Sequence, residues 1–172
     1  MKKCDYAFLI CLYLTQVMLL AAFLLESAAA LYGAFAAVLG SLIFGLICIF
    51  STLFKGRTAE IAELQKKMLV LKLTTIPFYL INFAIWGILG MAMLVVPGMF
   101  LGLPIVLIGT AYSYFCLLVT SANSIAFINF KYRNAQIPRR KAILHCVLQL
   151  IFVIDVIDCM YLYHINKKEL IP

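Results

Sequence analysis

Long stretches without charge are the feature that most constrains this chain. Lys, Arg, Asp and Glu are absent between Tyr6 and Leu25, between Ala30 and Phe54, and from Leu73 to Phe130. An α-helix of about 20 apolar residues crosses a hydrocarbon core about 30 Å thick. Each stretch is long enough for this, and 66% of the chain is hydrophobic. The sequence therefore predicts an all-α, polytopic integral membrane protein.

Turn-forming residues divide these stretches into spans. Glu26 and Ser27 separate the first two, and Pro97 followed by Gly98 ends the third. One more apolar run follows the last basic loop. We therefore expect a single transmembrane domain over residues 1–172 with five helices, at about 6–25, 30–54, 73–96, 104–130 and 142–163.

The last apolar run, residues 142–163, allows two interpretations. Its length favours crossing the bilayer. Its polar content opposes crossing, because an aspartate at the centre of a span costs about 2.5–3.5 kcal/mol, whereas each large apolar residue contributes only about 0.3–0.6 kcal/mol. Five spans would then depend on packing against the other helices. The alternative is four spans and a C-terminal helix at the membrane interface.

Basic residues predict the topology. Two Lys precede the first span, five Lys and Arg follow the second, five follow the fourth and two lie near the C-terminus. Cytoplasmic loops are enriched in Lys and Arg, so we expect the N-terminus and both basic loops in the cytoplasm. The net charge of +7 has the same explanation. Because the Lys and Arg residues lie in short loops between apolar spans, we do not expect the chain to bind nucleic acid.

The segment between the second and third spans, residues 55–72, carries a helical pattern. Ile61, Leu64, Met68 and Leu71 recur at helical spacing. The segment is either a short amphipathic helix on the membrane surface or a helical extension of the third span.

Small residues recur every four positions along the second span, at Gly33, Ala37, Ser41 and Gly45. Such a ridge lets another helix approach closely. We expect it to pack within the chain, against the first or another span, rather than between copies of the chain.

Polar residues in the last apolar run form the candidate intramembrane site. The residues are Asp155, Asp158, Gln149, His145 and, from the fourth span, Ser113 and Thr110. In one continuous helix Asp155 would lie roughly 4 to 5 Å beyond the midplane of the bilayer, and His145 would lie roughly 15 Å from Asp155 along the helix. Antiparallel packing on the fourth span would set Ser113 level with Asp155 and Thr110 level with Asp158.

The two aspartates therefore need an explanation, because a buried acid needs a partner or must be protonated. The five predicted spans contain no Lys or Arg, so an internal salt bridge is not expected. The remaining interpretations are a protonated or hydrated structural pair, an acid awaiting a base on another protein, and an acid that carries protons or cations.

No pattern in the sequence indicates catalysis. The six cysteines lack paired spacing, His145 and His164 do not converge on the aspartates, and neither G-x-S-x-G nor H-E-x-x-H occurs. We expect a protein that is not an enzyme, without catalytic residues, metal or cofactor.

The functional prediction follows from the absence of any soluble domain in the printed sequence. We expect an accessory or partner subunit of a membrane assembly, in contact with the lipid bilayer and with another membrane protein or with itself. The alternative is a small proton- or cation-coupled transporter or channel using Asp155 and Asp158. The organisation resembles that of small multi-pass proteins of bacterial plasma membranes, which predicts a cell-membrane location.

Overall fold

The fold is all-helical in the part of the chain that the structure describes. A computed structural model describes residues 3–55, 61–95, 102–151 and 153–169. These residues form six helices: α1 (Lys3–Leu25), α2 (Ala28–Lys55), α3 (Ile61–Val95), α4 (Leu103–Arg133), α5 (Arg139–Leu148) and α6 (Ile154–Glu169). The first four are long and apolar enough to cross a membrane, in agreement with the predicted class.

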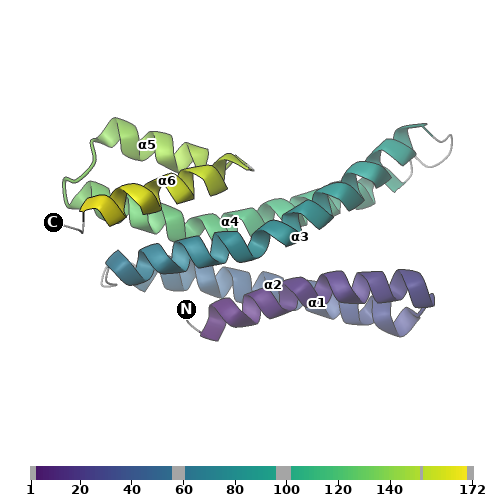
Figure 1. The fold of residues 1–172 in the computed structure, drawn as a ribbon. Coiled ribbons are helices and arrows are strands. Elements are labelled where there is room, and N and C mark those ends of the chain that lie inside the picture. Colours follow the sequence, from purple (N-terminus) through teal and green to yellow (C-terminus); the bar gives the residue numbers. More distant parts are fainter. Residues whose placement is uncertain (1–2, 56–60, 96–101, 152, 170–172) are drawn as a thin grey trace.

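Three helical hairpins make up the molecule (Figure 1). α1 and α2 pack along one side, and α3 and α4 form a second, longer pair against them. α5 and α6 fold back on each other and cover the N-terminal part of α3 and the C-terminal part of α4. The short hairpin therefore lies at one end of the four-helix assembly.

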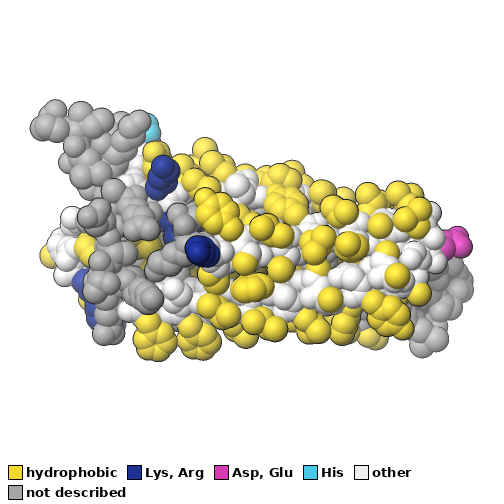
Figure 2. Space-filling model, turned by 90° about the horizontal axis from the view of Figure 1, so that it is seen from below, with side chains coloured by type: hydrophobic (Ala, Val, Ile, Leu, Met, Phe, Trp, Pro, Cys, Tyr) yellow, Lys and Arg dark blue, Asp and Glu magenta, His cyan; other side chains and the backbone are white. Residues whose placement is uncertain are grey.

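The side formed by α1 and α2 has the surface of a membrane protein. Hydrophobic side chains cover most of its length, and basic side chains gather at one end (Figure 2). Large apolar residues are widely exposed there, among them Phe23 at 82% and Phe35 at 66%. A surface of this kind is stable when lipid, rather than water, surrounds it.

Two of the predicted helix ends can be compared with the structure, and a third cannot. α1 ends at Leu25 and α2 begins at Ala28, as the Glu26 and Ser27 break predicts. Of the two interpretations of residues 55–72, the structure shows the extension, because α3 already begins at Ile61. Leu64, Met68 and Leu71 are buried on its inner side. The predicted stop at residues 97 and 98 lies outside the described residues.

A single helix over residues 142–163 is wrong. α5 ends at Leu148, α6 begins at Ile154, and Val153 has a positive φ of 73°. A β-branched residue rarely adopts this conformation, which reverses the chain direction here. The polar side chains of this run then turn towards α3, α4 and each other instead of towards lipid. The structure therefore offers four candidate spans, and the fifth is not supported.

Candidate functional site

Six side chains from four helices and one turn form what we call the polar network. They are Lys72, Ser121, His145, Gln149, Asp155 and Asp158. Five are buried, and His145 is partly buried. The network lies where α3 and α4 meet the α5–α6 hairpin, so it connects that hairpin to the long helices.

Lys72 and Asp155 form the central ion pair of the polar network. Lys72 Nζ donates a hydrogen bond to Asp155 Oδ2 and a second one, of 2.8 Å, to Ser121 Oγ. The two charged side chains are only 1% and 2% exposed. The expectation that the aspartates lack an internal salt bridge is therefore wrong for Asp155.

Lys72 ends the basic segment 55–72, so the charge pattern alone predicts it outside the third span. The helical spacing of the residues before it indicates instead that its side chain is buried. Leu64, Met68 and Lys72 recur every four residues, so Lys72 continues the buried stripe of α3. A lysine on an otherwise apolar stripe is the signal in the sequence that predicts a buried acidic partner.

Asp158 is held by two residues of the preceding helix and turn. His145 Nδ1 lies 2.6 Å from Asp158 Oδ1, and Gln149 Nε2 donates a 2.7 Å hydrogen bond to Asp158 Oδ2. The expectation that His145 does not converge on the aspartates is wrong for Asp158, because it assumed one straight helix. Reversal of the chain after Leu148 brings these side chains together.

Ser121 joins the two halves of the polar network. It accepts from Lys72 and donates a 2.7 Å hydrogen bond to the backbone oxygen of Gln149, in the turn after α5. This bond satisfies a carbonyl group that the helix end leaves free. Both aspartates are thus engaged by residues of the same chain.

Ser113 and Thr110 do not join the aspartates. Each donates a hydrogen bond to a carbonyl of its own helix, Thr110 to Val106 at 2.8 Å and Ser113 to Gly109 at 3.0 Å. Both residues line a cavity between α3 and α4 instead. The predicted placement of Ser113 level with Asp155 assumed one straight helix over residues 142–163. In the structure Asp155 pairs with Lys72, which also contacts Ser121 of α4.

The small residues of α2 lie against two different helices. A methyl group on Gly33 would lie 3.3 Å from Met18 Sδ of α1, and one on Gly45 would lie 2.9 Å from Val119 Cγ2 of α4. Ala37 and Ser41 are buried between them. The ridge therefore contributes to packing within the chain.

A second ion pair joins the start of α1 to α3. Lys67 Nζ lies 3.1 Å from Asp5 Oδ1, with side chains 9% and 1% exposed. The sequence analysis did not predict this pair, because the two residues lie far apart along the chain. Together with Lys72, it places buried charge at the same end of α3.

The described cysteines and acids do not suggest a metal centre. Within the described ranges, no group of three or more His, Cys, Asp or Glu side chains could hold a metal ion. All six cysteines are free. Burial raises the pKa of the Cys159 thiol, in α6 beside the polar network, to about 12.

The fold and the polar network define a helical protein with four candidate membrane-spanning helices, in which a buried ion pair connects the last helical hairpin to α3. The chain belongs to a protein family of unknown function, DUF6652, whose profile matches residues 4–168. No curated protein and no solved structure matches the chain.

Proposed function

We propose that this protein is a non-enzymatic accessory subunit of a membrane assembly and that it meets its partner through the α5–α6 hairpin. The supporting observation is the internal pairing of both aspartates. Acids engaged within the chain fix the hairpin in place, which is the requirement for a docking element. Contact with a partner would then use the outer face of the hairpin rather than the acids.

The outer face of the hairpin is apolar. Beyond the exposed basic residues Arg139, Arg140 and Lys141 at the start of α5, the residues of the polar network point towards the bundle, whereas large hydrophobic side chains are exposed along α5, the turn after it and α6. They include Ile143, Leu144, Val147, Leu150, Ile157 and Met160. A helix of another membrane protein that presents an apolar face at the same level fits this surface, because the contact would remove apolar area of both proteins from water.

Helix lengths support a four-span arrangement with the hairpin near the cytoplasmic boundary. At about 1.5 Å per residue, the distance from Asp5 to Leu25 is about 30 Å, from Lys72 to Val95 about 34 Å and from Leu103 to Ser121 about 27 Å. Each is close to the roughly 30 Å thickness of the hydrocarbon core. Asp5, Lys72 and Ser121 thus share one boundary, and the basic residues that the structure describes lie at it or beyond it, on the side expected to be cytoplasmic.

Topology can be tested with Lys168→Cys in intact cells. We expect no labelling by a membrane-impermeant maleimide from outside, and labelling after the membrane is opened, with the unsubstituted protein as background. Labelling from outside would place the C-terminus across the membrane and restore the five-span arrangement.

The partner can be tested by replacing Ile157 and Met160 together with Ala. Both side chains are more than half exposed, so the fold should persist. We expect loss of a specific co-purifying membrane protein, whereas Ile43→Ala combined with Leu46→Ala, on the exposed side of α2, should keep it. Equal recovery from both double variants would remove the hairpin as the docking element.

A transporter is the second candidate, because the polar network brings a histidine, a lysine and two carboxylates into contact. The position near one boundary gives it less support than the partner role, since transporter sites usually lie near the midplane. Asp155→Asn removes ionisation but keeps a hydrogen-bonding group. In reconstituted vesicles, proton or cation flux that collapses with this variant would favour transport over the accessory role.

A further inference from the structure

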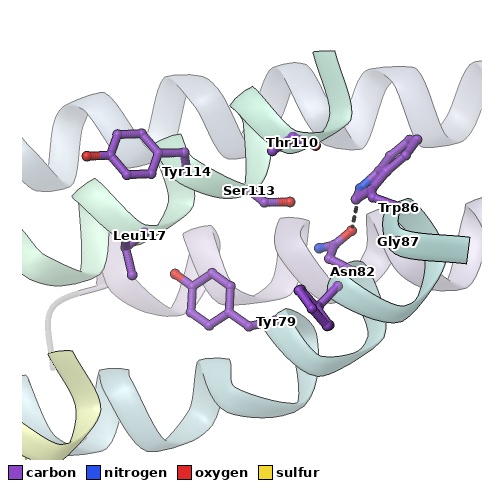
Figure 3. A pocket seen from close by; sticks show the side chains of 9 residues that line it. Tyr79, Asn82, Trp86, Gly87, Thr110, Ser113, Tyr114 and Leu117 are labelled. Carbon is purple, nitrogen blue, oxygen red and sulfur yellow. Dashed lines mark hydrogen bonds between the residues drawn. The ribbon is translucent and has the colours of Figure 1, made fainter. Parts of the chain in front are cut away.

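We propose that the cavity between α3 and α4 is a binding site for a flat, lipid-soluble carbonyl compound of the quinone class. This goes beyond the proposed accessory role and rests on a different part of the molecule. The cavity holds about 390 Å³ and is partly open to the surface, within the lower range of small-molecule sites, about 300 to 1,000 Å³. Four of its nine lining residues are aromatic, and Figure 3 shows Tyr79, Trp86 and Tyr114 around it.

Asn82 is the group that points to a ligand. Its side chain is 5% exposed, and its Oδ1 accepts a 3.1 Å hydrogen bond from Trp86 Nε1. Its Nδ2 has no hydrogen-bond partner among the described residues. Figure 3 shows this nitrogen facing the space beside Ser113 and Tyr79. A buried donor without an acceptor is costly, so the free Nδ2 calls for a hydrogen-bond acceptor inside the cavity.

The other polar groups of the cavity limit what that acceptor can be. The hydroxyl groups of Thr110 and Ser113 already donate to carbonyls of α4. Among the described residues, no ionisable group other than tyrosine lines the cavity. A charged ligand would therefore lie unpaired, whereas a neutral carbonyl accepts from Asn82 and a flat ring stacks on Trp86, Phe83 or Tyr79.

Depth in the bilayer argues against a phospholipid as the source of the carbonyl. Asn82 is ten residues beyond Lys72, or about 15 Å along α3, which is half of a core about 30 Å thick. Ester groups of phospholipids lie at the interface rather than at this depth. The acceptor must then belong to a molecule that dissolves in the core, as quinones with long apolar tails do.

Two glycines shape the cavity. A side chain on Gly109 would overlap the indole ring of Trp86, so glycine lets that ring lie against α4. A methyl group on Gly87, in contrast, would meet nothing within 4 Å. Gly87 lines the cavity and the first carbon of a side chain there has room, so we expect Gly87→Leu to occupy part of the cavity; a leucine is also favourable in a helix.

Trp86 reports on the cavity directly, because it is the single tryptophan of the chain. Purified protein in nanodiscs is titrated with decylubiquinone while tryptophan fluorescence is recorded. We expect saturable quenching, and we expect Gly87→Leu to abolish the saturable phase. The control Gly90→Ala lies one turn further on, makes only an ordinary 3.6 Å contact with Val106 and should behave as the unchanged protein.

Asn82→Leu tests whether the cavity recognises the carbonyl group of the ligand or only its apolar part. We expect this variant to bind decylubiquinone about tenfold more weakly, as the loss of one hydrogen bond requires, and to bind dodecylbenzene, which has no carbonyl, as tightly as the unchanged protein does. The second probe corrects for any movement of Trp86 when its acceptor is lost.

Three results would overturn the proposal. The first is quenching that rises linearly with decylubiquinone and is the same in the unchanged protein and in Gly87→Leu, which would show only partitioning into lipid. The second is equal affinity of the unchanged protein for decylubiquinone and dodecylbenzene, which would leave an apolar cavity without carbonyl recognition. The third is saturable binding that persists in Gly87→Leu, which would put the site elsewhere.

Discussion

The hairpins α1–α2 and α5–α6 share a topology but differ in what holds their helices. In α1–α2, small residues bring the helices together: a methyl group on Gly40 would lie 3.2 Å from Cys11 Sγ, as close as the one on Gly33 is to Met18. In α5–α6, hydrogen bonds from His145 and Gln149 to Asp158 connect the two helices. The first hairpin is held by close packing of small residues, whereas the second also has buried hydrogen bonds between its two arms.

The difference shows two ways of holding a helical hairpin together. For helices as apolar as α1 and α2, burial of apolar surface would give little advantage in lipid, because lipid tails are as apolar as the side chains. Close backbone approach therefore stabilises α1–α2 through van der Waals contact. The shorter α5–α6 hairpin has less surface for such contact, and its connection to α3 and α4 runs through Lys72, Asp155 and Ser121.

The largest expected effect comes from breaking the ion pair that connects the second hairpin. Lys72→Met leaves Asp155 buried without its cation and should lower the free energy of unfolding by about 3–5 kcal/mol. The double variant with Asp155→Leu removes both charges and should recover most of that loss. Unfolding in mixed micelles measures both. A double variant no more stable than the single one would show that the pair itself, rather than the unpaired acid, determines stability.

The docking of α6 can be followed through Cys159, which is fully buried and whose thiol has a pKa of about 12 because of that burial. Lys72→Met should accelerate maleimide labelling of Cys159 about a hundredfold, since the hairpin opens more often. If labelling proceeds through the open state, its rate should level off above the ordinary thiol pKa of 9.0. A rate that keeps rising towards pH 12 would instead show reaction of the docked thiol.

Close packing of α2 predicts a smaller effect. Gly45→Leu places a side chain against Val119 and Phe115, whose atoms would lie 2.9 and 3.0 Å from its first carbon. Overpacking of this kind should destabilise the fold by about 1–3 kcal/mol relative to Gly87→Leu, which faces open space. The comparison cancels the gain in helix propensity. Equal stabilities would mean that α2 and α4 separate at little cost.

The smallest effect is expected at the hydrogen bond between α2 and α4. Ser41 Oγ lies 2.8 Å from Tyr112 Oη, and Ser41 is fully buried. Ser41→Ala should lower the free energy of unfolding by about 0.5–1.5 kcal/mol. Thr74→Ala is the matched control, because that exposed hydroxyl donates to its own helix. A loss for Ser41→Ala no larger than the control's would show that Tyr112 finds another partner.

Local patterns predicted the long helices well. Uncharged stretches placed all four candidate spans, and the Glu26 and Ser27 break placed the first turn where the structure has it. These features depend on residues within about 20 positions of one another, which periodicity and turn preferences describe. The polar site was predicted only in part. His145 and Gln149 both contact Asp158, but the sequence did not predict the turn between α5 and α6 that brings them together.

The sequence by itself determined an all-helical chain with long apolar spans, its likeness to a membrane protein and the small-residue ridge of α2, because each is a property of neighbouring residues. The tertiary structure decided the rest. It alone brings Lys72 to Asp155, 83 positions apart, and places the Nδ2 of Asn82, which has no partner among the described residues, at a cavity between two helices. Such contacts follow from which helices pack together, and no local spacing specifies them.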